Sequence, residues 1–133
     1  EVFSSAYPLL VGLDNSDETL VYSTVKVMHQ NFDAYKNNAP GATGWRMDRQ
    51  KFGQAFVPYH PGAIRYYREI GVWSEEAEMQ NRKNLRRQFV LQQAWEKFLP
   101  SAPEDYTEFE LSWLIAREQA LADAEMITLG EGL

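Results

Sequence analysis

The chain has 133 residues, of which 44% are hydrophobic and 14% aromatic, so its composition supports a packed core and excludes a disordered chain. Its formal net charge of −6 argues against nucleic acid as a partner, because proteins that bind nucleic acid present a basic face. The absence of cysteine excludes disulfides, thiolate metal sites and cysteine nucleophiles.

An apolar stretch at 7–13, with the sequence YPLLVGL, predicts a short buried strand because turn-forming residues flank it on both sides. It is far shorter than the roughly 20 apolar residues needed to cross a bilayer. A strand also needs partners in a sheet. The chain is therefore either an all-helical domain with an extended arm or the C-terminal part of a longer protein whose sheet lies upstream. The lack of an initiator Met favours the second alternative.

The first predicted helix follows this stretch. Asn15 can cap its start, and Asn37 lies near its expected end, before a Pro-Gly pair. Apolar residues at spacings of three and four should place one face of this helix on the core. That stripe consists of Val21, Val25, Met28, Phe32 and Tyr35.

A shorter helix is predicted at 45–56, although Gly53 disfavours it. Two long amphipathic helices follow near the C-terminus. Ser74 can cap the first of them, which should run to about Phe98. Thr107 can cap the second, which has an apolar stripe at near-heptad spacing. The stripe consists of Phe109, Trp113, Ala116, Ala120 and Ile127.

A helix is also predicted at 61–70, after the unusual sequence His60-Pro61-Gly62. Pro61 suits the first turn of a helix and holds His60 extended, and Gly71 suits the position after the last turn. Gly62 is small enough for the helix start to approach another backbone closely. The N–H groups at this start could also bind an anion.

Charges are segregated along the two long C-terminal helices. The segment 104–133 has eight acidic residues and one Arg, which gives it a local charge of −7. A basic cluster precedes it; this cluster could bind an anion or an acidic partner, or it could pair within its own helix with upstream glutamates such as Glu78. The basic cluster consists of Arg82, Lys83, Arg86 and Arg87.

Motifs of catalytic or cofactor sites are missing from the sequence. It contains no G-x-S-x-G, P-loop, G-x-G-x-x-G, H-E-x-x-H or EF-hand pattern, so we expect no enzyme activity, no cofactor and no metal site. His29 and His60 are the only histidines. His29 lies beside the apolar stripe of its helix, where a partly buried or solvent-facing position is expected rather than metal ligation.

The stretch VPYHPGAIRYYREIGVW at 57–73 resembles the C-terminal signature of the TAXI family, the solute-binding proteins of TRAP-type transporters. That signature is a Pro-x-His-Pro-Gly-Ala segment that leads into a Tyr-Tyr-x-Glu-x-Gly helix. Residues 7–28 resemble the strand, acidic turn and helix that the family has upstream. The matching residues of the signature are Pro58, His60, Pro61, Gly62, Ala63, Tyr66, Tyr67, Glu69 and Gly71.

This resemblance implies that the chain, mostly α by itself, is the C-terminal portion of an α/β two-lobed type II periplasmic binding protein. Residues 1–73 would belong to its solute-binding domain. Such receptors bind a small organic anion or amino acid in the periplasm and deliver it to membrane subunits, without catalysis. The family's ligand contacts lie mostly upstream, which leaves Tyr59 and His60 as the ligand-binding candidates here.

The resemblance stops at residue 73. Typical members of the family end soon after the Tyr-Tyr-x-Glu-x-Gly helix, whereas this chain continues. Residues 74–133 would therefore be a helical C-terminal extension that covers the receptor, docks on the membrane subunits or forms a homo-oligomer through the 104–127 helix. The alternative function is a helical oligomerisation or protein-interaction module. An apolar stripe alone does not separate these possibilities, because a helix packed on its own domain shows the same stripe.

Overall fold

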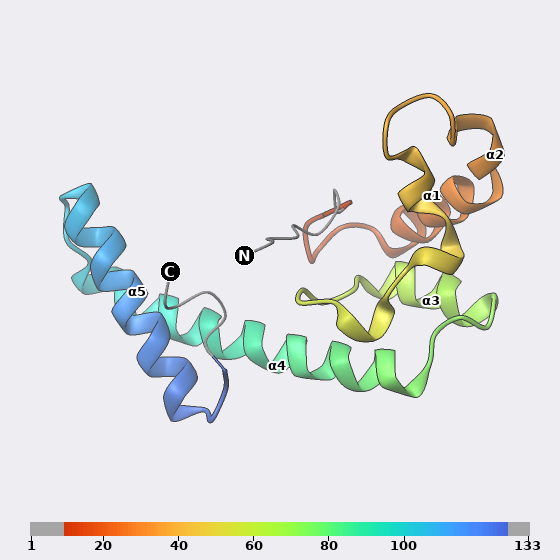
Figure 1. Ribbon diagram of the computed structural model, residues 1–133. Coiled ribbons are helices and arrows are strands. Elements are labelled where there is room, and N and C mark those ends of the chain that lie inside the picture. The colour runs from red at the N-terminus through yellow and green to blue at the C-terminus, as the bar shows by residue number, and fades with distance from the viewer. Residues whose placement is uncertain (1–9, 128–133) are drawn as a thin grey trace, which may run out of the picture. The chain divides into compact units, whose positions relative to one another are not determined.

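The computed structural model describes residues 10–127 (Figure 1). Within this range the chain forms two compact units. The first contains residues 10–55 and 59–80, and the second contains 56–58 and 81–127. The predicted boundary between 73 and 74 stays a prediction, since the two units are defined by contacts rather than by ligand binding.

The described part of the chain is all-helical, with five α-helices and no β-strand between residues 10 and 127. The predicted strand at 7–13 is wrong for its described residues 10–13, which are irregular and exposed; residues 7–9 lie outside the described range. Leu10, Val11 and Leu13 are 59%, 75% and 73% exposed. An apolar run forms a strand only beside a partner strand, and the described residues supply none.

The first predicted helix is divided into α1 (Glu18–Gln30) and α2 (Phe32–Tyr35). Asp17, rather than the predicted Asn15, caps α1, and its carboxylate accepts the N–H of the third residue of the helix at 2.7 Å. Asn31 separates the two helices with ψ at 18°. Its side-chain amide donates to a carbonyl of α1, a local bond that competes with helix continuation. The predicted apolar stripe is half-buried.

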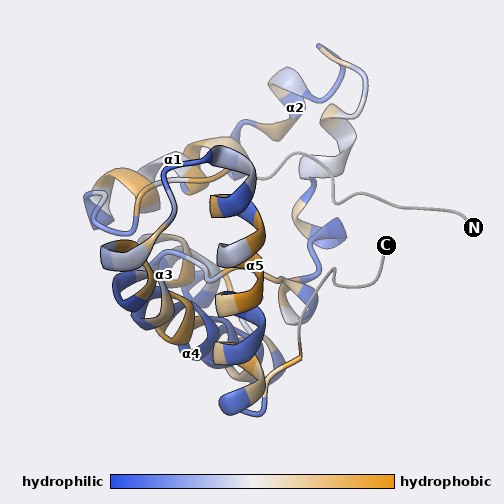
Figure 2. Cartoon of the chain, turned by 90° about the vertical axis from the view of Figure 1, so that its left-hand side faces the viewer, coloured by the Kyte–Doolittle hydropathy of each residue, from blue (hydrophilic) through white to orange (hydrophobic). Residues whose placement is uncertain are grey.

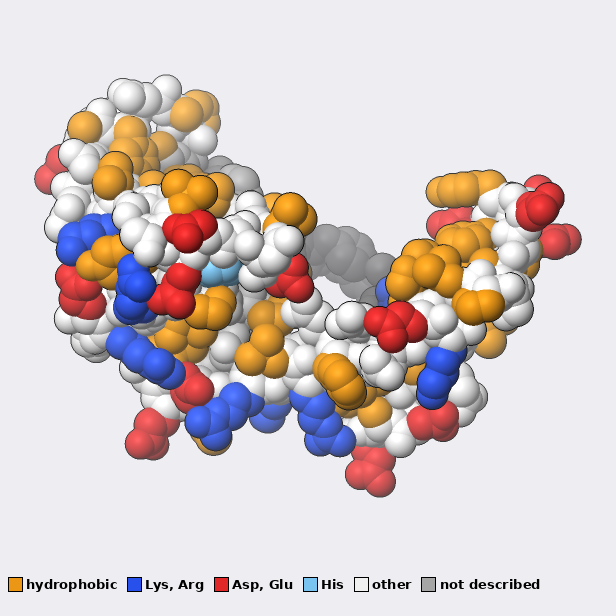
Figure 3. Space-filling model, turned by 180° about the vertical axis from the view of Figure 1, so that it is seen from behind, with side chains coloured by type: hydrophobic (Ala, Val, Ile, Leu, Met, Phe, Trp, Pro, Cys, Tyr) orange, Lys and Arg blue, Asp and Glu red, His pale blue; other side chains and the backbone are white. Residues whose placement is uncertain are grey.

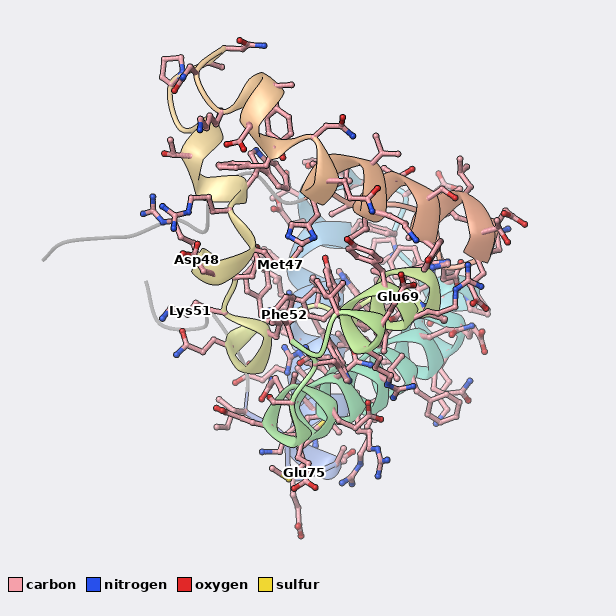
Figure 4. All side chains as sticks on the ribbon, turned by 90° about the vertical axis from the view of Figure 1, so that its right-hand side faces the viewer. Met47, Asp48, Lys51, Phe52, Glu69 and Glu75 are labelled. Atoms are coloured by element: carbon pink, nitrogen blue, oxygen red, sulfur yellow. The ribbon has the colours of Figure 1, made fainter. Side chains whose placement is uncertain are left out.

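The α-helix predicted at 45–56 is wrong. Three 3-10 turns occupy this part of the chain: η1 (Ala42–Trp45), η2 (Met47–Arg49) and η3 (Phe52–Gln54). The side-chain amide of Gln50 donates to two backbone carbonyls upstream, at 3.0 and 2.9 Å, which ties the turns together without an α-helical bond ladder. Figure 4 shows the aromatic ring that opens η3 directed toward α3.

The helix predicted at 61–70 is confirmed as α3 (Pro61–Glu69). Gly71 follows it with φ at 73°, in the left-handed region that favours glycine. Its N–H donates to the Arg68 carbonyl at 3.1 Å, and the N–H of Val72 donates to the Tyr67 carbonyl at 3.0 Å. These two bonds are those of a Schellman motif, so the glycine ends the helix as its sequence position predicts.

The two long C-terminal helices are confirmed as α4 (Glu75–Phe98) and α5 (Tyr106–Asp123), joined through η4 (Leu99–Ser101). The Ser74 hydroxyl accepts an N–H of the first turn of α4 at 3.1 Å, as predicted. The predicted cap of α5 is wrong. Asp105 accepts two N–H groups of the first turn, whereas Thr107 lies inside the helix.

In the first unit α1 lies against α3 (Figure 1), and Gly62 makes this contact possible. A Cβ atom on Gly62 would lie 2.3 Å from the carbonyl oxygen of Glu18 and 2.9 Å from the backbone nitrogen of Tyr22. The two backbones therefore touch where no side chain can intervene. Three neighbours on α3 are buried with it: Ala63, Ile64 and Tyr66.

The second unit is held by four aromatic side chains where α5 packs on α4. The Trp113 ring lies 4.8 Å from that of Trp95 and 5.4 Å from that of Phe98, and Phe109 lies 5.3 Å from Phe98. Part of the predicted stripe of α5 thus packs on its own chain. Ile127, the last member of that stripe, lies beyond the end of the helix and is 80% exposed.

We predict that Gly62→Ala destabilises the protein by about 2–3 kcal/mol, because a backbone contact cannot yield as a side chain can. Chemical denaturation monitored by circular dichroism would measure this change. Gly12→Ala is the matched control: its Cβ would meet only the Ser16 hydroxyl at 3.5 Å, an ordinary contact. Its effect should stay within about 0.5 kcal/mol. Equal stability of the two variants would contradict the close approach of α1 and α3.

Candidate functional site

His60, a predicted ligand-binding candidate, joins the starts of α1 and α3. Its backbone is extended, with ψ at 141°, as Pro61 requires. Its Nδ1 accepts the N–H of Gly62 at 3.1 Å, and its Nε2 lies 3.1 Å from the Ser16 carbonyl oxygen. Since Nδ1 accepts a hydrogen, the proton of the neutral ring resides on Nε2, which donates to that carbonyl.

The N–H groups at the start of α3 are already paired. Gly62 donates to the His60 ring, and the N–H groups of Ala63 and Ile64 donate to the His60 carbonyl at 2.9 and 3.1 Å. Pro61 has no N–H to offer. The anion site that the sequence suggested at this helix start therefore lacks available donors. His60 acts here as a cap and as a clasp between two helices.

Tyr59, the other candidate, belongs to an aromatic cluster of the first unit. Its ring lies 5.3 Å from that of Trp73 and 5.8 Å from that of Phe52. Tyr67 of α3 stacks on Trp73 with an interplanar angle of 12°, and its ring lies 4.6 Å from that of Phe52. Burial raises the pKa of the Tyr59 phenol, and burial together with Tyr59 raises the pKa of Tyr67 to about 12. The aromatic cluster consists of Phe52, Tyr59, Tyr67 and Trp73.

Glu78 ties the aromatic cluster to the first turns of α4. Its Oε2 accepts the indole N–H of Trp73 at 2.8 Å and a guanidinium N–H of Arg68 at 2.8 Å. A carboxylate that accepts two such donors fixes the orientation of both side chains. In Figure 4 the side chains of Asp48, in η2, and of Lys51, just after it, point away from α3 and take no part in this cluster.

A second polar group, which we call the α1–α3 network, lies along the contact between those helices. Arg65 donates to Glu18 at 2.8 Å, and its guanidinium carbon lies 4.1 Å from the centre of the Tyr22 ring. Tyr22 donates to Glu69, which also accepts from Lys26 at 3.1 Å. The network consists of Glu18, Tyr22, Lys26 and His29 of α1 with Arg65, Tyr66 and Glu69 of α3.

Ionisation in the α1–α3 network follows from these bonds. The bond from Tyr22, and then the bond from Lys26, lowers the pKa of the Glu69 carboxyl. The bond to Tyr22, and then the bond to Glu69, raises the pKa of Lys26. His29, whose Nδ1 lies 2.8 Å from the hydroxyl of Tyr66, is partly buried as predicted. Tyr66 is 2% exposed, and this burial raises its pKa. Each polar group at this contact thus has a definite partner.

Two open hollows lie in the first unit, and neither includes Tyr59 or His60. The larger, of about 580 Å³, has an apolar lining that includes Met28, Tyr35 and Trp45. The smaller, of about 330 Å³, is lined by polar and charged residues together with the apolar Phe32 and Met47. These residues are His29, Gln30, Phe32, Asp33, Arg46, Met47 and Asp48. Arg46 pairs with Asp48, and Asp33 pairs with Lys36 at 2.6 Å.

The described residues form aromatic packing contacts, hydrogen bonds and ion pairs. Between residues 10 and 127 no group of three or more metal-ligating side chains is close enough to hold an ion. No helix in the same range is sufficiently long and apolar to cross a bilayer. Sequence reasoning located His60 and Gly62, but it missed the aromatic cluster and the α1–α3 network. The regular spacing of Glu18, Tyr22 and Lys26 was the signal for the network.

We predict that His60→Ala destabilises the protein by about 1–2 kcal/mol, because it removes a helix cap and leaves the Ser16 carbonyl without its donor. His60→Asn should cost less, since the Asn side chain can still cap Gly62 but is too short to reach Ser16. Thermal and chemical denaturation would rank the three proteins. If His60→Ala were as stable as the parent protein, the capping role would be wrong.

We also predict that Tyr67 makes stability pH-dependent between pH 10 and 12. Folding raises its pKa from 10.0 to about 12, so its contribution is complete below pH 10 and is lost as pH rises to 12. The contribution amounts to about 3 kcal/mol. Tyr67→Phe should therefore lose less stability than the parent protein over this interval. Tyr106→Phe, at a position 77% exposed, is the control and should follow the parent curve.

Comparison with known proteins gives a family match for the N-terminal part of the chain. Residues 6–71 match the NMT1-like family, and this match covers His60 and both helices of the α1–α3 contact. No curated protein and no solved structure matches the chain significantly. The NMT1-like family is a binding-protein family. Residues 6–71 are therefore an NMT1-like family domain, periplasmic-binding-protein-like and related to the TAXI receptors of TRAP transporters.

Proposed function

We propose that this chain is part of the solute-binding receptor of a TRAP-type transporter. The receptor binds a small organic anion or amino acid in the periplasm and delivers it to the membrane subunits of the transporter. The observation that carries this proposal is the NMT1-like match over residues 6–71. The TAXI-like signature at 57–73 supports it, because the signature residues His60, Gly62 and Gly71 all have definite structural roles.

Those roles indicate what the domain contributes to a receptor. A binding protein of the two-lobed type needs a stiff base on which its cleft opens and closes. The first unit has the features of such a base: a backbone contact at Gly62, a clasp at His60 and an aromatic cluster around Tyr67. In this proposal the lobes and most ligand contacts come from residues upstream of the described chain.

Tyr59 and His60 stay the proposed ligand-binding residues, but the partners of their side chains limit how they could contact a ligand. Both side chains are engaged, Tyr59 with Trp73 and His60 with Gly62 and Ser16. A ligand that reached the imidazole would have to replace one of its two bonds. We therefore propose that Tyr59 and His60 help to line the ligand-binding cleft, and that charged groups of other residues bind the anion.

Ligand-dependent thermal stabilisation of the natural protein, including any residues that precede this sequence, tests the function. A panel of small organic acids and amino acids should contain compounds that raise the melting temperature. A ligand at about 100 times its Kd adds roughly 2.7 kcal/mol to the free energy of unfolding, which is a rise of a few degrees.

Sodium chloride at matched ionic strength is the control, because it separates specific binding from general screening. An unchanged melting temperature across a broad panel would remove the main support for the receptor function. Stabilisation by one compound class, and not by its uncharged analogues, would identify the charged group that the cleft binds.

A further inference from the structure

α5 has a second apolar side that its own chain leaves exposed. Phe109 and Trp113 face α4, whereas Leu111 and Ile115 lie about half a helical turn away and are 58% and 69% exposed. Figure 2 shows hydrophobic positions along the length of this helix. A helix that is apolar on both sides is typical of one covered by a second partner. We call Glu108, Leu111, Ile115 and Glu118 the acidic stripe.

α4 has an exposed stripe of the opposite charge. Leu85 and Phe89 are 50% and 62% exposed, one helical turn apart, and basic residues adjoin them. The side of α4 that carries Trp95 is the one that contacts α5. Figure 3 shows Lys and Arg side chains gathered along α4 and hydrophobic side chains along α5. We call Arg82, Leu85, Arg86 and Phe89 the basic stripe.

The two stripes match in spacing as well as in charge. Along α4 the order Arg82, Leu85, Phe89 has intervals of three and four residues. Along α5, read in the opposite direction, the order Glu118, Ile115, Leu111 has the same intervals. An antiparallel pair of helices would therefore place Arg82 beside Glu118, with both apolar pairs in register.

We propose that a second copy of this chain covers these surfaces. The acidic stripe cannot reach the basic stripe of its own chain, because α5 already faces α4 through Trp113 and Trp95. Because each stripe points away from the other helix of its own chain, the two stripes lie on opposite sides of the α4–α5 pair. Each copy would therefore meet one neighbour through α4 and another through α5, in a head-to-tail arrangement. The interface differs from the stripe that near-heptad spacing predicted for 104–127, which is in part used within the chain.

Sedimentation of the 133-residue chain over a range of concentrations tests this inference. We expect self-association that increases with concentration and weakens as salt rises, because opposite charges meet at the interface. Ile115→Asp should leave only monomer. Val27→Asp, at a position 57% exposed on α1, is the matched control and should associate like the parent protein. A parent protein that stays monomeric at every concentration overturns the proposal.

A charge swap tests the register. Glu118→Lys and Arg82→Glu alone should each raise the Kd of self-association about tenfold, whereas the double variant should return to within about threefold of the parent value. Circular dichroism tests whether each variant is folded. If a variant fails to fold, Leu111→Ala is a milder substitution that replaces it. A double variant as weak as the single ones refutes the antiparallel register. Ligand-induced stabilisation should persist in Ile115→Asp, which separates this proposal from the receptor function.

Discussion

The first unit depends on one contact, the approach of the Gly62 backbone to the backbone of α1 at Glu18 and Tyr22. Because the helices touch at this point, the residues around it have fixed partners. His60 can span from the start of α3 to Ser16, and Arg65 can reach Glu18. The α1–α3 network is a consequence of this approach, since its side chains are too short to bridge helices held further apart.

Local signals in the sequence predicted the helices with strong ends. Ser74 and Gly71 act on groups within a few residues of themselves, so their roles in α4 and around α3 could be predicted. The division at Asn31 and the 3-10 turns at 42–54 could not, because side-chain amides there bond to nearby carbonyls in place of a continued helix. Asp105 replaced the expected cap of α5 since several polar residues compete at that position.

The candidate site was predictable to the same limited degree. His60 and Gly62 drew attention because their conformational needs are local. The aromatic cluster brings Phe52 beside Tyr67 and Trp73, and no spacing rule connects residues so far apart in the chain. His60 and Gly62 therefore hold α1 and α3 together, and the family match, rather than any arrangement of reactive groups, carries the functional proposal.

The aromatic contacts also give the protein an optical signature of its own. The Trp95 and Trp113 indoles lie 4.8 Å apart and almost perpendicular, an arrangement in which their electronic transitions couple and produce a paired band in circular dichroism. Trp73, stacked on Tyr67, is close enough to receive excitation energy from it. The two units thus contain separate chromophores, and the loss of tertiary structure in one can be followed by light without a label while the other stays folded.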